Sequence, residues 1–408
     1  MNRINKLMGQ NYQKAIARIG LNKTLAFLIL VFAFTIPISQ FFSVRLLFCI
    51  CLLSVSFQDL GRSSLSLLKN AWDIGLYLIV LTIGLLYSED ISMGLKVLET
   101  SFSLFAIPII FSRTSQSEKD QFYNILLSFC LGLVLISLLC LAAASLSFYH
   151  YGDSKAFFFY QLVQQSDLQP TYLAYYLCFA ITLGLYFLYY EITRLPPWIL
   201  VSSIILLFIV LMLTAGRTSY ISMLLTFSFF ILKFFFEEKA NAAKTKTFFI
   251  SIILLIGMLA VNHFDLNTRS YAPSENNDYW ERLILWKAAL KANPDFLFGV
   301  GTGDYKKVLN EYFLSHGLIQ YAKSSYNSHN QFIESLFSNG LIGLLSLIFL
   351  IGRPLYLAVR HQNVLGILVF FPFLIYGVTE VFLGRYQGVV FFSLLHQCFI
   401  SRYNSKEI

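Results

Sequence analysis

The sequence reads FYNILLSFCLGLVLISLLCLAAASL from residue 122 to residue 146, and this stretch contains no charged side chain. A helix needs about 20 apolar residues to cross the hydrocarbon core of a bilayer. Because lipid offers no hydrogen bonds to an open backbone, we expect an apolar run of this length to be helical. The whole chain is similar in character, since 57% of its residues are hydrophobic and 13% are charged. This composition excludes an ordinary soluble globular domain.

Similar runs of about 17–25 mostly apolar residues recur along the chain. They predict an all-α, polytopic membrane protein with about twelve transmembrane helices. The predicted spans are 24–39, 42–57, 71–87, 94–112, 122–146, 169–189, 197–214, 217–236, 247–264, 331–351, 364–382 and 386–401. Basic residues precede the first run, but the sequence before it contains no cleavage site of small residues such as a signal peptide has. We therefore expect that run to be a retained span and not a removed signal peptide.

The lysines and arginines between these runs are distributed unequally across the predicted membrane. If both termini are cytoplasmic, the cytoplasmic loops contain about seventeen Lys and Arg residues, and the opposite short loops contain about three. This asymmetry predicts a multi-pass protein of a cytoplasmic membrane. Topology thus accounts for the net charge of +8, and we expect no nucleic-acid partner. All six cysteines lie in apolar runs without metal-ligand spacing, so we expect packing roles and no metal site.

Two segments on the predicted outer side are too long to be simple turns. They are residues 149–169 and residues 265–330, and the second contains apolar residues at helical spacing. The sequence therefore predicts three regions, which are residues 1–264 with spans one to nine and the short outer segment, residues 265–330 as a helical outer subdomain, and residues 331–408 with the last three spans and a cytoplasmic tail.

A glycine cluster, Gly299-Val300-Gly301-Thr302-Gly303, follows Pro294 in the outer subdomain. Gly-x-Gly patterns can cradle phosphates, but this one lacks a preceding strand and a following Lys-Ser or Lys-Thr pair. We interpret it as a tight turn that positions the loop, and we expect no nucleotide cofactor.

Three residues at the outer ends of predicted spans, Arg217, Arg282 and His329, are candidates for chemistry, because charge at such places is costly. Two guanidinium groups can bind a diphosphate through their planar forks, and a histidine with a pKa of about 6.5 can accept a proton near neutral pH. Each also has an ordinary explanation. Arg217 could anchor the chain at the interface, Arg282 could be a solvated helix residue, and His329 could be an interfacial histidine.

A more specific pattern begins at His329-Asn330, which is followed by nine residues, Gly340, two residues and Gly343. This pattern resembles the signature of the O-antigen ligase and O-antigen polymerase superfamily. We expect the two glycines to lie on one helix face and to admit another helix closely. Two other stretches resemble the same family, namely Thr214–Ser219 with its arginine, and Glu281–Trp286 with Pro294 and Gly299–Gly301.

The resemblance implies a GT-C-like membrane glycosyltransferase that needs neither metal nor cofactor. Such enzymes take a glycan from an undecaprenyl diphosphate carrier at the periplasmic face of the bacterial inner membrane, with inversion at the anomeric carbon. Ligases transfer it to a sugar hydroxyl of the lipid A core, polymerases to another carrier-linked repeat, and some relatives to protein. By the same resemblance, Arg217 and Arg282 would bind the diphosphate and His329 would activate the acceptor hydroxyl. Asn330, Gln331 and Tyr172 are further candidate substrate contacts.

We favour a ligase over a polymerase because one long outer segment contains both Arg282 and His329. A flippase or transporter is a third possibility, but transporters usually place their charged residues at the bilayer midplane. The expected partners are the carrier-linked donor, the lipid A-core acceptor and membrane lipid, and we expect a monomer.

Other polar residues near the motifs have less defined roles. Asp304 and Glu334 are candidates to orient His329 or to share its proton. Glu380 and Arg385 flank the last outer turn, and we interpret them as a structural ion pair. His150, Tyr160 and Tyr172 in and next to the first outer segment could stack on sugar faces, although aromatics are common at membrane interfaces.

Overall fold

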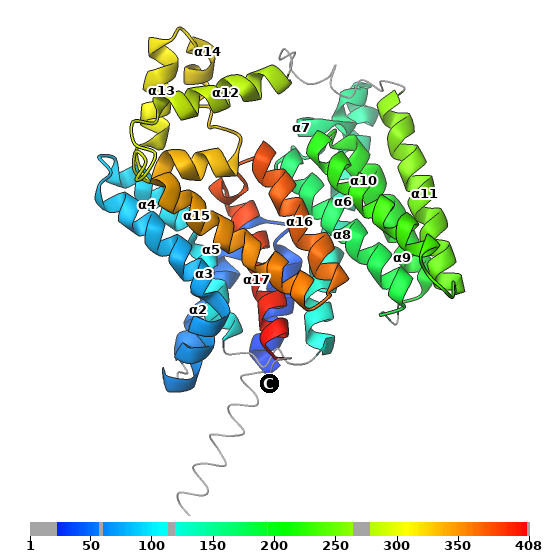
Figure 1. The fold of residues 1–408 in the computed structure, drawn as a ribbon. Coiled ribbons are helices and arrows are strands. Elements are labelled where there is room, and N and C mark those ends of the chain that lie inside the picture. The colour runs from blue at the N-terminus through cyan, green and yellow to red at the C-terminus, as the bar shows by residue number, and fades with distance from the viewer. Residues whose placement is uncertain (1–22, 57–59, 113–118, 194, 264–277, 406–408) are drawn as a thin grey trace, which may run out of the picture.

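The computed structural model describes residues 23–56, 60–112, 119–193, 195–263 and 278–405, and these residues fold as an all-α protein (Figure 1). A first helix covers Lys23–Thr35. The helices that follow are α2 (Gln40–Ser56), α3 (Leu60–Leu86), α4 (Ile91–Thr100), α5 (Phe102–Phe111), α6 (Lys119–Tyr151), α7 (Phe159–Leu162), α8 (Pro170–Tyr190), α9 (Pro197–Leu213), α10 (Arg217–Phe235), α11 (Ala242–His263), α12 (Asp278–Ala292), α13 (Tyr305–Ser315), α14 (Ile319–Lys323), α15 (Gln331–Arg360), α16 (Val364–Thr379) and α17 (Tyr386–Ser405), with short 3-10 helices η1 (Ser154–Phe157) and η2 (Phe382–Gly384).

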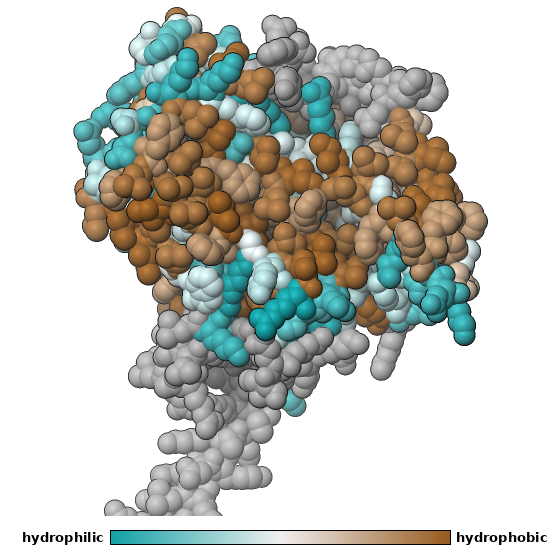
Figure 2. Space-filling view, in the orientation of Figure 1, coloured by the Kyte–Doolittle hydropathy of each residue, from teal (hydrophilic) through white to brown (hydrophobic). Residues whose placement is uncertain are grey.

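The helices confirm a polytopic membrane protein. Within the described residues, seven helical segments are long and apolar enough to cross a bilayer, and four shorter helices are also apolar. Every predicted span coincides with a helix, except that the span predicted at 94–112 is divided between α4 and α5. Figure 2 shows an apolar belt with polar surfaces above and below it, and the upper polar surface covers α12–α14. We call this upper surface the subdomain side. The exact number of spans stays a prediction.

Helix α8 is the centre of the bundle. Its candidate span is 89% buried inside the protein, whereas the other long spans are between 22% and 50% buried. It packs against α9, α10, α11 and α16, and its aromatic side chains interlock with those of its neighbours. Tyr176 and Phe391, for example, have ring centroids 4.7 Å apart, and Phe391 also stacks on Phe129. A central helix of this kind is a rigid support for residues at its subdomain end.

Helices α12, α13 and α14 form a small subdomain that has its own apolar cluster. The cluster contains Leu285, Ala288, Ala289, Leu309, Phe313, Tyr321 and Phe337. The first three recur at the spacing of one helix face, as the sequence pattern predicted. Phe337 belongs to α15, so the subdomain packs directly onto a membrane helix. The polar stretch that precedes α12, from Asn267 onward, lies outside the described residues.

Helix α15 bends at Asn339 and Gly340, where the backbone is not helical. The bend frees the carbonyl groups of Phe337 and Ser338, and these accept hydrogen bonds from the amides of Val300 (3.0 Å) and Gly301 (2.8 Å). The glycine cluster is therefore a turn whose amides provide hydrogen bonds to the carbonyl groups that the bend leaves free. This agrees with its interpretation as a tight turn.

The two glycines of the sequence signature have a different role from the one predicted. Gly340 has a φ of 62°, and a Cβ there would lie 2.2 Å from the carbonyl oxygen of Leu297. The close neighbour is thus the loop before α13, and not another helix. A Cβ on Gly343 would lie 2.7 Å from the carbonyl oxygen of Ser335, in the part of α15 before the bend. Both glycines are required by the bend.

Candidate functional site

Glu380 brings together residues that are far apart in the sequence. It ends α16 on the subdomain side, and its Oε2 atom lies 3.2 Å from Nδ1 of His329. Its other oxygen, Oε1, lies 3.9 Å from Nη2 of Arg282 in α12. The side chains of His329, Arg282 and Glu380 are 32%, 26% and 23% exposed, so a ligand can reach all three. Two of the three predicted catalytic residues therefore share one carboxylate.

Arg217, the third predicted residue, begins α10 immediately after a tight turn. Ala215 in that turn has a φ of 53°, which lets the chain reverse between α9 and α10. The next residue in α10, Thr218, donates a hydrogen bond of 2.9 Å to Thr379, the residue before Glu380. The start of α10 thus lies against the end of α16, and Arg217 belongs to the same region of the protein as Glu380.

His329 is held in an uncommon backbone conformation just before α15. Its φ is 44°, in the left-handed region that non-glycine residues seldom adopt. Its amide donates to Oδ1 of Asn327 at 3.0 Å. Such strain persists only where surrounding contacts enforce it, and it is concentrated at functional sites.

Asn330 and Gln331, two predicted substrate contacts, already have hydrogen bonds within the protein. Oδ1 of Asn330 caps α15 by accepting from the amides of Phe332 (2.9 Å) and Ile333 (3.0 Å). Oε1 of Gln331 accepts from the amide of Leu383 at 2.8 Å, which attaches the turn between α16 and α17 to α15. Both side chains are buried. Their contact with substrate stays a prediction, and their visible role is to fix the site.

Tyr172 lies in the first turn of α8 and is also buried. Its hydroxyl is 3.5 Å from the carbonyl oxygen of Val381, the residue after Glu380. A side chain on Gly388 would come within 2.9 Å of the Tyr172 ring, so the two helices are in close contact here. Tyr172 therefore packs directly under the turn that contains Glu380, and its stacking on a sugar stays a prediction.

The hydrogen-bond partners of the acidic residues differ most from those that the sequence predicted. Asp304 accepts from the amides of Glu89 and Asp90, both at 2.8 Å, so it attaches the glycine cluster to the start of α4 and does not orient His329. Glu334 supports the backbone next to His329, since its Oε2 accepts from the amide of Ser328 at 3.3 Å and from Oγ of the same residue at 2.7 Å. The direct partner of His329 is Glu380. Its place at the end of an apolar span was the signal that could have identified it.

The charge state of His329 depends on these neighbours. Burial lowers the pKa of His329, but the hydrogen bond to Glu380 and the negative charge of Glu380 outweigh that effect. The positive charge of Arg282 opposes them, and the net result is a pKa above the usual value. Because a carboxylate can only accept, Nδ1 of His329 carries the proton in this pair, and Nε2 is the nitrogen without a proton when the ring is neutral.

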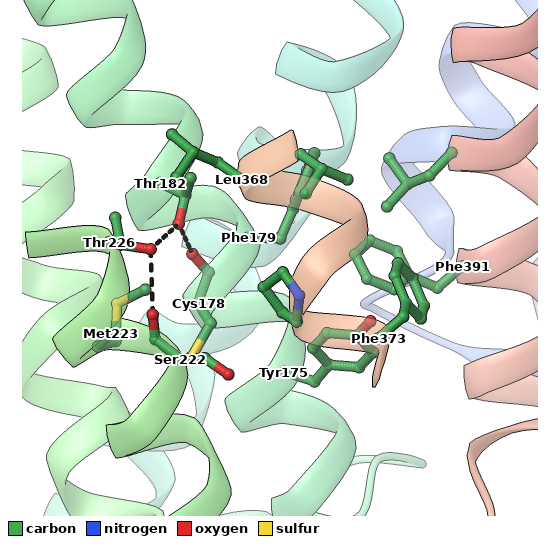
Figure 3. Close-up of a pocket in the computed structure, with 13 residues that line it drawn as sticks. Tyr175, Cys178, Phe179, Thr182, Ser222, Met223, Thr226, Leu368, Phe373 and Phe391 are labelled. Carbon is green, nitrogen blue, oxygen red and sulfur yellow. Dashed lines mark hydrogen bonds between the residues drawn. The ribbon is translucent and has the colours of Figure 1, made fainter. Parts of the chain in front are cut away.

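A pocket within the apolar belt lies deeper than these residues (Figure 3). It is enclosed by α8, α10, α16 and α17, and Arg217, Arg282 and His329 do not line it. The hydroxyl groups of Thr182 and Thr226 lie 3.2 Å apart, and each donates to a carbonyl group of its own helix. Small polar residues of this kind let membrane helices pack closely. The buried hydroxyl group of Tyr175, by contrast, has no hydrogen-bond partner among the described residues.

The comparison with known proteins agrees with the sequence motifs. Residues 201–348 match the family model described as O-Antigen ligase, so this segment is a domain of that family. Arg217, Arg282 and His329 lie inside the match, and Glu380 lies beyond it. A protein of Haemophilus influenzae described as uncharacterized is 25% identical over 178 residues, which are 41% of this chain and 40% of the relative. The aligned region thus covers less than half of that relative.

Proposed function

Because residues 201–348 match the O-antigen ligase family, we propose that this protein is an inverting membrane glycosyltransferase of the ligase type. It transfers a glycan from undecaprenyl diphosphate to a sugar hydroxyl of the lipid A core, at the periplasmic face of the inner membrane. The observation that supports this best is the pairing of His329 and Arg282 with Glu380 on the subdomain side of the belt.

The leaving group determines what the arginines do. When the bond between the anomeric carbon and the diphosphate oxygen breaks, negative charge develops on the diphosphate. Arg217 and Arg282 offer planar, permanently charged donors that bind this charge more strongly as it develops. A diphosphate with such partners leaves without a strong general acid.

The acceptor hydroxyl must lose its proton as it forms the new glycosidic bond. His329 fits this step because Nδ1 is held by Glu380 at 3.2 Å, which leaves Nε2 as the basic nitrogen. Glu380 orients the ring and stabilises the imidazolium that forms, as a carboxylate does in other acid–base pairs. Attack from the side opposite the diphosphate inverts the configuration of the anomeric carbon.

Polymerisation of carrier-linked repeats is the alternative within the same family, since it uses the same donor chemistry and differs only in the acceptor. Transfer to protein differs in the same respect. The ligase is favoured because the single outer segment 265–330 supplies both Arg282 and His329.

Deletion of the gene, followed by analysis of the cell-surface lipopolysaccharide, tests these assignments. Loss of a ligase leaves bare core and an accumulation of long carrier-linked polymer. A core capped with a single repeat would instead identify a polymerase. Accumulation of carrier-linked repeats on the cytoplasmic side would identify a transporter and would contradict the proposed reaction.

A further inference from the structure

The turn between α16 and α17 has an acidic residue at one end and a basic residue at the other. Glu380 faces His329 and Arg282, as described above. Arg385 at the other end is exposed, and its guanidinium group faces Gln169, the residue before α8. With the amide oxygen of Gln169 turned toward it, that oxygen accepts from Nη2 at 3.1 Å and from Nη1 at 3.2 Å. These partners replace the ion pair between Glu380 and Arg385 that the sequence suggested.

The hydrogen-bond partner of Arg385, Gln169, is neutral. No ion pair within 4.0 Å joins Arg385 to a carboxylate of the described residues. Asp167, two residues before Gln169, has other partners, since its Oδ2 accepts from Oγ of Ser39 at 2.9 Å and from the amide of Gln40 at 3.1 Å. A neutral amide therefore holds the guanidinium in position and leaves its charge available.

Arg385 is also fixed by contacts on both sides of it in the chain. The amide of Leu383 donates to Gln331 at 2.8 Å, and Nε2 of Gln387 donates at 3.0 Å to both Gln40 and the carbonyl group of Asp167. An exposed cation on so rigid a turn loses little conformational freedom when it binds an anion.

The position of Arg385 connects it to the reaction site. Tyr172 packs under the same turn, with its hydroxyl 3.5 Å from the carbonyl oxygen of Val381, and only residues 381–384 separate Glu380 from Arg385. The two bonds to Gln169 use only some of the N–H donors of a guanidinium group, so a bidentate contact to another anion is still available. Phosphate oxygens match that planar fork, and they are the anionic groups of the proposed donor.

We propose that Arg385, held by Gln169, is a phosphate-binding residue at the edge of the reaction site. This inference rests on the proposed function for the source of the phosphate, which is either the diphosphate of the carrier lipid or a phosphate group on the acceptor. Arg217 and Arg282 act on the leaving group during the reaction. Arg385 instead contributes to the binding of substrate.

The decisive variant is Gln169→Glu in the full-length protein. A glutamate has the same shape as the glutamine and can keep the bidentate contact, but it neutralises the charge of Arg385. If Arg385 only supports the turn, Gln169→Glu leaves binding unchanged. If Arg385 binds phosphate, Gln169→Glu and Arg385→Gln weaken binding by a similar factor, on the order of tenfold or more for a charge-assisted hydrogen bond. Arg45→Gln is the matched control, since Arg45 is exposed and its described contacts are a hydrogen bond to the carbonyl group of Phe41 and a cation–π contact with the ring of the same residue.

The first probe is a short-chain polyprenyl diphosphate without glycan, with the polyprenyl alcohol as its uncharged counterpart. We expect both variants to lose affinity for the diphosphate and not for the alcohol. If diphosphate affinity is unchanged but the KM for a phosphorylated lipid A core rises relative to a dephosphorylated core, the phosphate comes from the acceptor, and the inference also holds. Wild-type values in both measurements overturn it, as does a change confined to binding of anionic phospholipid vesicles.

The test of Arg385 can fail independently of the proposed function, because binding of the diphosphate probe needs no turnover. A wild-type protein that binds the diphosphate through Arg385 but transfers no glycan to lipid A core refutes the proposed reaction alone. Normal transfer with normal substrate affinity in Gln169→Glu refutes the inference about Arg385 alone.

Discussion

The side chain of Glu380 acts on His329 through a hydrogen bond and through its charge, and both raise the pKa of His329 against the effect of burial. A base works in its deprotonated form, so transfer should rise with pH through the pKa of His329. Glu380→Gln removes the charge, and the pKa of His329 should then fall. We expect the acidic limb of the pH–rate profile to move to lower pH and the maximum rate to decrease. An unchanged acidic limb in this variant would show that His329 is not the titrating base.

The arginines and the histidine should differ in how their variants behave. Arg217→Lys and Arg282→Lys keep the charge but lose the planar fork, so we expect both to impair donor binding and transfer. His329→Ala should reduce turnover by about 10²–10⁴-fold and leave donor binding near normal, because a base acts on the acceptor hydroxyl. Equilibrium binding of carrier lipid and single-turnover transfer in the same membranes make this comparison. Loss of carrier-lipid binding in His329→Ala would contradict its assigned role.

At the scale of elements, the bend in α15 is the feature on which the site depends. The helix starts next to His329, and its bend receives the loop that joins α12 to α13. Gly340→Ala places a Cβ 2.2 Å from the carbonyl oxygen of Leu297 at a φ of 62°. We expect a loss of roughly 2 kcal/mol or more in unfolding free energy, since a strained conformation and a backbone clash add together.

Gly352→Ala is the matched control for that substitution. Gly352 lies in the same helix, and a Cβ there would meet nothing within 4 Å. Alanine is also the better helix former, so this variant should be neutral or slightly more stable. Thermal unfolding of both purified variants in detergent provides the measurement. Equal unfolding temperatures would mean that the bend does not need glycine.

At the scale of the whole molecule, a buried polar cluster joins three helices far from the candidate site. Asp73 in α3 is fully buried, and its two oxygens lie 2.6 Å from Nη1 of Arg353 in α15 and 2.7 Å from Nε2 of His396 in α17. Arg353 also donates to the carbonyl groups of Lys69 and Asn70, next to a break in α3 at Ala71. The cluster therefore links α15 and α17 to the irregular part of α3.

Removal of one partner from this cluster should damage folding more than chemistry. Arg353→Ala leaves the carboxylate of Asp73 buried without its cation, which typically costs about 3–5 kcal/mol. We expect a lower yield of folded protein and a lower unfolding temperature, with unchanged donor affinity in the fraction that folds. Arg360→Ala, at an exposed arginine near the end of the same helix, is the control. Normal stability of Arg353→Ala would mean that Asp73 is not charged in the folded protein.

The sequence by itself determined the helices and the candidate chemistry, because both depend on local information. Long apolar runs require helices in lipid, and the motifs around Arg217, Arg282 and His329 are continuous in the chain. The tertiary structure decided the contacts between distant residues. Glu380 is 51 positions from His329, and Asp304 is 215 positions from Glu89, its partner. No periodicity encodes such pairs, since the packing of whole helices sets which side chains meet. For the same reason, only the structure could show that Gly340 serves a bend and that Arg385 is held by a neutral glutamine.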